Sequence, residues 1–431
     1  MKFQPPKGTR DFLPEETIAR QKVIEVIKNV FENYGFQPLE TPAIESWEVL
    51  SAKGAGGNEI LKETYNFEDL GKRRIGLRYD LTVPLARVVA SNPSLQLPFK
   101  RYQIEKVWRY GDVTKGRFRE FLQADIDTIG SDGVVADAEI IACAISTFTS
   151  LGFEKFLVRI NNRKILTALG KYAKISSKIN AVFTAIDKLD KVGIKGVERE
   201  LTELKLKKDS IKIILDFIQI QGEPLKTLNK AEKLIGNITE GKQGIAELKE
   251  LIGYLRKMKV EPKFKVDFSL ARGLDYYTGP IFEVFAEEGI GSIAGGGRYD
   301  KMIGLFSGKD ISATGISLGI ERIIEVMKER KMIKETRSKT KVFVAAVNDE
   351  VRDETLGLVQ KLRQNGISAD FDLKSRNLTR QLEYADSIGI PFVIIVGKNE
   401  LNKNAVKVKD MIKSKESEVK LSNLINFLTE S

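Results

Sequence analysis

Two segments decide the fold of this chain: SLARGLDYYTG at residues 269–279 and AGGGRYD at residues 294–300. Within a short span they combine arginines, a tyrosine pair, carboxylates and several glycines. Glycine lets backbone approach a ligand closely, while Arg and Tyr supply donors for an anionic, ring-bearing one. Few purely structural roles need all of these residue types together, so the two segments predict a ligand site.

A basic stretch upstream, RYGDVTKGRFREF at 109–121, lies between residues 102–108 and 121–129, which both alternate like strands. A hairpin that presents Arg to phosphates and Phe to a purine has this composition. Taken alone, the stretch fits an exposed basic hairpin equally well. A third segment, GISLGIERII at 315–324, is predicted to be a strand that runs into an amphipathic helix.

Polar side chains suited to an ammonium group occur in two places. Asp80 and Thr82 in LRYDLTVP are two residues apart, so we expect them on one side of a strand or turn. The same spacing puts Gln123, Asp125 and Asp127 on one face of the strand after the hairpin.

Together these segments resemble the histidyl-tRNA synthetases, in particular their archaeal–eukaryotic branch. Residues 109–121 resemble motif 2 of the class II enzymes, 315–324 resemble motif 3, and 269–279 with 294–300 resemble the two histidyl signatures. The helix around 20–33 and the strand that enters Pro42 would form motif 1, the least specific of the three. The resemblance covers nearly all of 1–330 and, more loosely, 340–431.

The resemblance implies a fold and an activity. The fold would be an α+β catalytic core built on an antiparallel sheet, with a helical insertion and a C-terminal α/β anticodon-binding domain. The activity would be ATP-dependent ligation of L-histidine to its tRNA through a histidyl-adenylate. ATP would be a substrate and Mg²⁺ is expected, with no metal ligands assigned. The partners would be L-histidine, ATP, tRNA(His) and a second copy of the chain, bound through the motif 1 region.

The family's site residues map onto this sequence one by one. By the resemblance, Asp80, Thr82 and Gln123 would hold the α-amino group of histidine, and Asp127 with Tyr277 would pair with its imidazole. Arg109 and Arg272 would clamp the α-phosphate and act as the catalytic residues, and Arg322 would reach the γ-phosphate. The full histidine-binding set would be Asp80, Leu81, Thr82, Arg109, Gln123, Asp127, Arg272, Tyr276 and Tyr277, and the ATP-binding set Arg109, Arg117, Phe121 and Arg322.

Amino-acid composition and hydrophobic spacing along the chain predict four regions. Residues 1–163 and 263–330 would form the two parts of the catalytic core, and 164–262, rich in Lys, Leu, Ile and Glu at helical spacing, the insertion. Residues 340–431 alternate strands and helices and predict a small α/β domain with a largely parallel sheet. That domain lacks a glycine-rich phosphate loop, so we expect no nucleotide site there.

Composition excludes several kinds of chemistry. The chain contains no histidine, which removes any imidazole base and any His-ligated metal. Its one cysteine, Cys143, lies in an apolar helical pattern and is expected in the core. If the pocket carboxylates had ordinary pKa values, kcat would be flat between about pH 6.5 and 8.5.

Net charge and hydropathy limit the kinds of partner that the chain is expected to have. The net charge of +11 suits a polyanion such as nucleic acid, although a lysine-rich solvated surface suits it nearly as well. There is no membrane-length apolar run and no signal-peptide pattern at the start, so a cytoplasmic protein is expected.

Two alternatives share the fold. One is a catalytically inactive, synthetase-like regulatory subunit of histidine biosynthesis, which would usually lose the signature arginine and the anticodon domain. The other is a sensor of tRNA-like RNA. This chain keeps Arg109, Arg272, Arg322 and the last domain, which favours the enzyme.

Overall fold

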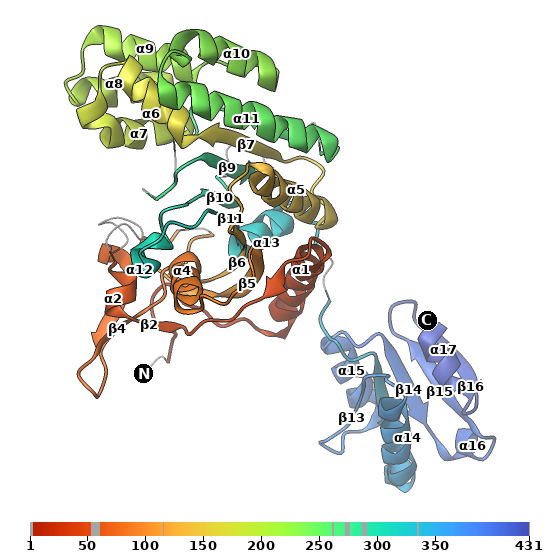
Figure 1. Cartoon of the computed structure of the whole chain (residues 1–431). Coiled ribbons are helices and arrows are strands. Elements are labelled where there is room, and N and C mark those ends of the chain that lie inside the picture. The colour runs from red at the N-terminus through yellow and green to blue at the C-terminus, as the bar shows by residue number, and fades with distance from the viewer. Residues whose placement is uncertain are drawn as a thin grey trace. The chain divides into compact units, whose positions relative to one another are not determined.

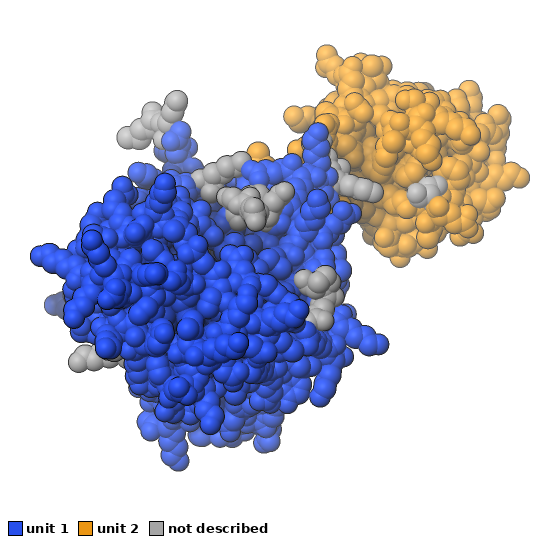
Figure 2. All heavy atoms as spheres, turned by 90° about the horizontal axis from the view of Figure 1, so that it is seen from above, with its two compact units in different colours: residues 1–10, 23–332 blue, residues 11–22, 333–431 orange. Residues whose placement is uncertain are grey.

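The computed structural model of the chain describes residues 3–52, 61–114, 116–260, 263–271, 276–286, 291–333 and 336–430. The chain forms two compact units, coloured separately in Figure 2. One contains residues 1–10 and 23–332, and the other contains residues 11–22 and 333–431. Over the described ranges, no helix is both long enough and apolar enough to cross a membrane.

The first unit is built on an eight-stranded sheet in the order β1-β5-β6-β11-β10-β9-β7-β8. All neighbours from β5 to β7 pair antiparallel, and only the end pairs β1–β5 and β7–β8 are parallel. The antiparallel α+β core predicted from the sequence is therefore confirmed. The strands are β1 Gln37–Pro38, β5 Phe99–Trp108, β6 Glu120–Ile129, β7 Leu157–Asn162, β8 Phe264–Val266, β9 Pro280–Phe285, β10 Ala294–Arg298 and β11 Ala313–Gly319.

Helices accompany this sheet in the positions that hydrophobic spacing predicts. The helix expected from residue 20 begins earlier, at Pro14, because proline suits a first turn and Glu15 and Glu16 follow it. It ends before Gly35, whose φ of 78° a helix interior cannot accommodate. The expected core position of Cys143 is also confirmed, since its side chain is buried. These helices are α1 Pro14–Asn33, α4 Thr82–Ser91, α5 Val135–Ser150 and α13 Ile320–Glu329.

Between β7 and β8 the chain is helical, and these helices gather together in Figure 1. β7 and β8 are parallel neighbours in the sheet, so the helical segment leaves and returns at adjacent strands. Buried Leu, Ile and Phe side chains line the inner faces of its helices, as amphipathic spacing requires. The segment comprises α6 Arg163–Tyr172, η1 Ser176–Lys178, α7 Ile179–Asp187, α8 Leu189–Glu203, α9 Lys208–Ile218, α10 Pro224–Ile235 and α11 Thr239–Lys257.

A small antiparallel sheet, in the order β2-β4-β3, and two short helices complete the first unit. These elements are β2 Ile44–Ser46, β3 Asn66–Glu68, β4 Arg74–Leu77, α2 Trp47–Leu50 and α12 Gly304–Ser307.

The second unit contains a five-stranded sheet in the order β13-β12-β14-β15-β16. The α/β alternation was predicted, but the largely parallel sheet is wrong, because β14–β15 and β15–β16 are antiparallel. The sequence of β16, KESEVK, shows one buried side chain and no apolar alternation, as charged edge strands do, and so gives no strand signal. The elements are β12 Val342–Ala346, η2 Asp349–Val351, α14 Arg352–Gln364, β13 Ala369–Phe371, α15 Leu378–Ser387, β14 Phe392–Val396, α16 Lys398–Leu401, β15 Ala405–Asp410, β16 Lys415–Lys420 and α17 Leu424–Glu430.

Candidate active site

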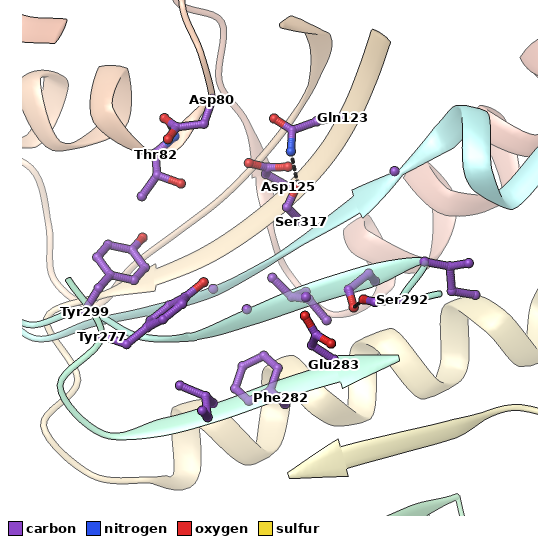
Figure 3. A pocket seen from close by; sticks show the side chains of 18 of the residues that line it. Asp80, Thr82, Gln123, Asp125, Tyr277, Phe282, Glu283, Ser292, Tyr299 and Ser317 are labelled. Atoms are coloured by element: carbon purple, nitrogen blue, oxygen red, sulfur yellow. Dashed lines mark hydrogen bonds between the residues drawn. The ribbon is translucent and has the colours of Figure 1, made fainter. Parts of the chain in front are cut away.

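A cavity of about 420 Å³ opens over the middle of the eight-stranded sheet. Its walls come from β6, β9, β10 and β11, from the segment that precedes α4, and from Tyr276 and Tyr277 (Figure 3). Segments far apart in the sequence therefore meet at one place. Of the expected site residues, the cavity is lined by Asp80, Thr82, Arg109, Phe121, Gln123, Asp127, Tyr276, Tyr277 and Arg322.

The register of β6 against β11 creates room for the polar face of β6. Gln123, Asp125 and Asp127 pair with Gly319, Ser317 and Gly315 respectively. A Cβ atom on Gly315 would lie 1.9 Å from Oδ1 of Asp127, far inside van der Waals contact. Glycine at 315 is therefore what lets this carboxylate face the cavity.

Asp127 is fixed from two sides. Tyr299 donates its hydroxyl to Oδ1 in a short, buried hydrogen bond. Arg101, directly opposite on β5, places Nη2 2.7 Å from Oδ2, without hydrogen-bond alignment, and donates to the carbonyl of Leu81 at 3.2 Å. The Arg101 side chain has 0% exposure. A buried carboxylate beside a buried guanidinium in this way can accept from a ligand N–H while its own position stays fixed.

Asp80 lies in a turn and caps a helix. Its Oδ1 accepts from the backbone N–H groups of Thr82 and Val83, each at 3.0 Å, at the start of α4. This is the capping role that Asp favours at helix starts. The other carboxylate oxygen, Oδ2, is buried and has no hydrogen-bond partner among the described residues.

Gln123 and Asp125 are joined through Ser317. Nε2 of Gln123 donates to Oγ of Ser317 at 2.7 Å (Figure 3), and Ser317 also bonds Asp125. Burial raises the pKa of Asp125 to about 7, although the charge of Arg101 acts in the opposite direction. Burial likewise raises the pKa of Asp80 and of Asp127. The ordinary carboxylate values assumed from the sequence are therefore wrong, because these groups are shielded from water.

Two arginines, Arg109 and Arg322, also line the cavity. Arg109 lies between aromatic rings, 4.3 Å from the centre of Tyr79 and 5.1 Å from that of Phe121, and its Nε donates to the Tyr79 carbonyl at 3.1 Å. Arg322 donates from Nη1 to the carbonyl of Ser292. Ring stacking fixes the plane of a guanidinium and leaves its edge able to grip an anion in two places.

Three tyrosines form an aromatic cluster at the cavity base. The rings of Tyr276 and Tyr277 meet edge to face at 4.8 Å, and Tyr276 also meets Tyr299 at 5.9 Å. Burial raises the pKa of each hydroxyl, so all three stay protonated and able to donate at neutral pH.

Three expected site residues are not placed in the cavity wall. The Leu81 side chain is fully buried, so only its backbone is available as a polar partner. Arg117 is exposed on the turn of the β5–β6 hairpin, where its backbone pairs with Thr114. Arg272 lies outside the described residues.

Two important residues have no assigned role in the sequence interpretation. Arg101 could have been found by extending the strand pattern upstream, since hairpin pairing sets it opposite Asp127. Arg298 of the second signature is structural: it bonds Asp137 of α5 through Nε at 3.0 Å and two loop carbonyls through its terminal nitrogens. Asp137 is in turn bonded by Thr314 at 2.7 Å, which completes a buried and fully paired network.

The described residues do not form a metal cage. Within the ranges that the structure describes, no three His, Cys, Asp or Glu side chains are grouped so that they could hold a metal ion. Mg²⁺ commonly keeps several waters and binds through one or two carboxylates plus substrate phosphates.

Both units resemble known protein families. Residues 8–323 match the family model "Histidyl-tRNA synthetase", and residues 341–431 match an anticodon binding domain. The chain is 41% identical to the histidine–tRNA ligase of Aeropyrum pernix, over 92% of this chain and 91% of that one, and 40% identical to that of Korarchaeum cryptofilum, over 99% and 98%. Among solved structures, histidyl-tRNA synthetase from Nostoc sp. PCC 7120 is 32% identical with a TM-score of 0.89, over 100% of this chain and 99% of that one.

Proposed function

The chain belongs to the histidyl-tRNA synthetase family and joins histidine to tRNA, and we propose from this premise how its cavity carries out the reaction. The observation that carries the proposal is that the lining of one cavity combines two kinds of side chain. Asp80, Gln123 and Asp127 supply acceptors, here called the acceptor half of the lining, and Arg109 and Arg322 supply cationic donors, here called the cationic half. An amino acid and a nucleoside triphosphate need these two environments side by side.

In the acceptor half, histidine would bind by both ends. Its α-ammonium group would donate to Asp80, Thr82 and Gln123, and its imidazole would donate to Asp127 and accept from Tyr277. Tyr299 and Arg101 keep Asp127 in place, so an imidazole N–H finds an acceptor at a fixed position. A ligand without that N–H would leave a buried acceptor unpaired, which penalises analogues.

In the cationic half, ATP would bind with its base near Phe121 and its phosphates near arginines. Arg109 would hold the α-phosphate with Arg272, Arg322 would hold the γ-phosphate, and Arg117 would contact ATP from the hairpin turn. Mg²⁺ would enter with the phosphates, whose oxygens are its usual ligands.

The first reaction step is adenylate formation. A carboxylate oxygen of histidine attacks the α-phosphorus of ATP in line, the bond to the bridging oxygen breaks, and pyrophosphate leaves. Negative charge gathers on the equatorial phosphate oxygens, and fixed guanidinium groups stabilise it without reorganising. In the second step a terminal tRNA hydroxyl attacks the acyl carbon, and AMP leaves. No imidazole of the enzyme is needed, in agreement with the absence of histidine.

The four-region organisation is part of the same proposal. Residues 1–163 and 263–330 would form the catalytic core, 164–262 an insertion, and 340–431 the unit that binds the anticodon. A homodimer through the motif 1 region and a cytoplasmic location would follow the family. The regulatory-subunit alternative, in which the last domain is usually lost, is disfavoured because residues 341–431 match an anticodon binding domain.

The direct test is exchange of pyrophosphate into ATP, measured with each of the twenty amino acids. Only histidine should support exchange, and tRNA(His) should then become charged. Exchange with no amino acid would favour the regulatory interpretation, and exchange with another amino acid would contradict the assignment of the acceptor half.

A further inference from the structure

Four buried oxygen atoms of residues that line the cavity have no hydrogen-bond partner among the described residues: Oδ2 of Asp80, Oε1 of Gln123, Oδ1 of Asp125 and Oδ2 of Asp127. The Asp127 oxygen lies 2.7 Å from the guanidinium of Arg101, so three oxygens remain without either a donor or an adjacent cation. The residues that carry these three, Asp80, Gln123 and Asp125, are 6%, 7% and 2% exposed. A buried acceptor left unpaired costs about 1–3 kcal/mol. Such a group is therefore expected to be completed by a bound molecule that carries donors.

The family resemblance accounts for Asp80 and Gln123 but assigns nothing to Asp125. The bridge through Ser317 links Asp125 to Gln123. Because Ser317 Oγ accepts from the Gln123 amide, its own proton is available to Asp125. The amide NH₂ of Gln123 is thus used inside the protein, so Oε1 of Gln123 and Oδ1 of Asp125 both remain as acceptors for a ligand.

The charge balance points to a cation. The charges of Asp80 and Asp127 raise the pKa of Asp125, and that of Asp80 raises the pKa of Asp127, whereas the buried cation Arg101 lowers the pKa of all three. Arg101 contacts Asp127, and its remaining nitrogens Nε and Nη1 have no partner among the described residues. Arg109 acts on Asp80 as well but is committed to the cationic half. Three carboxylates that share one buried arginine are not fully neutralised, so a bound ligand with a positive charge would be favoured here.

The position along β6 selects which end of the substrate supplies that charge. Asp127 is held in place by Tyr299 and Arg101 and is the acceptor proposed for the imidazole. Asp125 lies two residues before Asp127 on the same face of β6, a distance of ~6.6 Å along the strand. Ser317 links Asp125 to Gln123, the residue proposed to bind the amino group of histidine. In Figure 3, Asp80 and Thr82 lie near Gln123 and Asp125, in agreement with the effect of Asp80 on the pKa of Asp125.

We propose that Asp125 is a specificity-determining residue that binds the α-ammonium group of histidine together with Asp80 and Gln123. An ammonium group has three N–H donors, and the three unpaired oxygens would receive one each. This inference rests on the proposed histidine site and adds a carboxylate to it. The ion pair would form as histidine enters and would make the cavity prefer an amino acid to its deaminated analogue.

The test compares ligands that differ in the ammonium group. Asp125→Asn keeps the size and removes the charge, and Asp353→Asn, an exposed acid in α14, serves as control. We expect Asp125→Asn to raise the KM for histidine on the order of 10- to 100-fold, with the KM for ATP nearly unchanged. It should weaken inhibition by L-histidinol, which has the ammonium group, but not by 3-(imidazol-4-yl)propanoate, which lacks it.

Equal weakening of both inhibitors, or of neither, would overturn the role of Asp125. A wild-type enzyme that shows no histidine-dependent exchange would instead overturn the proposed function, so the two failures are distinguishable. Thermal unfolding of each variant checks folding. If Asp125→Asn does not fold, Asp125→Ser provides the same inhibitor comparison.

Discussion

At the scale of single residues, the cavity depends on carboxylates that are buried and yet must remain ionised to bind a cation. Arg101 and Tyr299 contact Asp127 directly, and both oppose the effect of burial on its pKa. Among the described residues Asp125 has no ion-pair partner of this kind, and burial raises its pKa to about 7. The two acids are neighbours on one strand face, and burial raises the pKa of both.

The first prediction concerns pH. In the free enzyme, Asp125 is protonated below about pH 7 and cannot attract an ammonium group, so kcat/KM for histidine should fall as pH decreases through about 7. The histidine imidazole titrates nearby, but it does so equally for Asp125→Asn. The ratio of the wild-type to the variant profile should therefore rise with pH through about 7, while kcat at saturation changes little. A ratio independent of pH would contradict the raised pKa. The polar groups that face Asp125 are Arg101, Asp80, Gln123, Asp127 and Ser317.

The second prediction concerns Arg101. Arg101→Met preserves much of the volume but leaves Asp127 as a buried charge without its cation. Loss of one partner of a buried pair typically costs about 3–5 kcal/mol, so the free energy of unfolding should fall by about that much. Urea unfolding at pH 7.5 measures it, with Arg101→Lys as the charge-preserving control. Equal stability of wild type and Arg101→Met would mean that Asp127 is protonated in the native protein.

The third prediction concerns Arg272, whose role follows from the family resemblance. If Arg272 acts mainly in the transition state, Arg272→Ala should lower kcat for adenylate formation on the order of 10²- to 10³-fold and leave the KM for histidine nearly unchanged. Single-turnover measurement with excess enzyme isolates this step. An unchanged rate would remove Arg272 from the mechanism.

At the scale of elements, the site is a consequence of strand register. Asp127 on β6 pairs with Arg101 on β5 and with Gly315 on β11. The acid therefore has a cation on one neighbouring strand and a residue without a side chain on the other. A shift by one residue would turn the acidic face of β6 away from the cavity.

Gly315→Ala tests this dependence on space. The backbone at 315 can accept alanine, but the new Cβ would lie 1.9 Å from Asp127 Oδ1 and 2.7 Å from the Ile126 carbonyl. We expect at least a ten-fold rise in the KM for histidine, on the order of the loss of one charged hydrogen bond, with a smaller effect on ATP. Gly357→Ala in α14 is the matched control, because no atom lies within 4 Å of its Cβ position. Unchanged histidine binding in Gly315→Ala would show that Asp127 has more freedom than its contacts imply.

At the scale of the whole molecule, the two compact units have separate cores. Buried residues such as Val344, Ile394 and Leu428 form the core of the second unit by themselves. Residues 11–22 belong with residues 333–431, although they lie at the other end of the chain.

Truncation after Thr340 follows from this division. The shortened chain keeps the contact of Lys22 with Thr336 at 2.8 Å and that of Arg337 with Glu15 at 3.9 Å, so the start of α1 retains these partners. Adenylate formation should survive, because the cavity belongs entirely to the first unit. Charging of tRNA should fall sharply, because the anticodon-binding unit is missing. Full charging activity in the truncated protein would contradict the anticodon role, and pyrophosphate exchange serves as the folding control.

The family, the antiparallel core and most of the cavity wall could be predicted from the order of residues alone. Helix and strand periods are local properties, and motif residues such as Asp80, Gln123 and Arg109 reach the cavity because their strands and turns carry them there. The α/β alternation of the second unit was likewise predictable, except for the charged edge strand β16.

The environment of those residues, in contrast, became known only from how the chain folds. Burial, which raises the pKa of Asp125, and the opposition of Arg101 and Tyr299 to Asp127 depend on segments that are far apart in the sequence. A charge is costly or useful according to the groups packed around it, and a single sequence does not state which groups those are. That is why the carboxylates of the cavity could be named from the sequence, while their ionisation, and the unpaired oxygen that assigns a role to Asp125, could not.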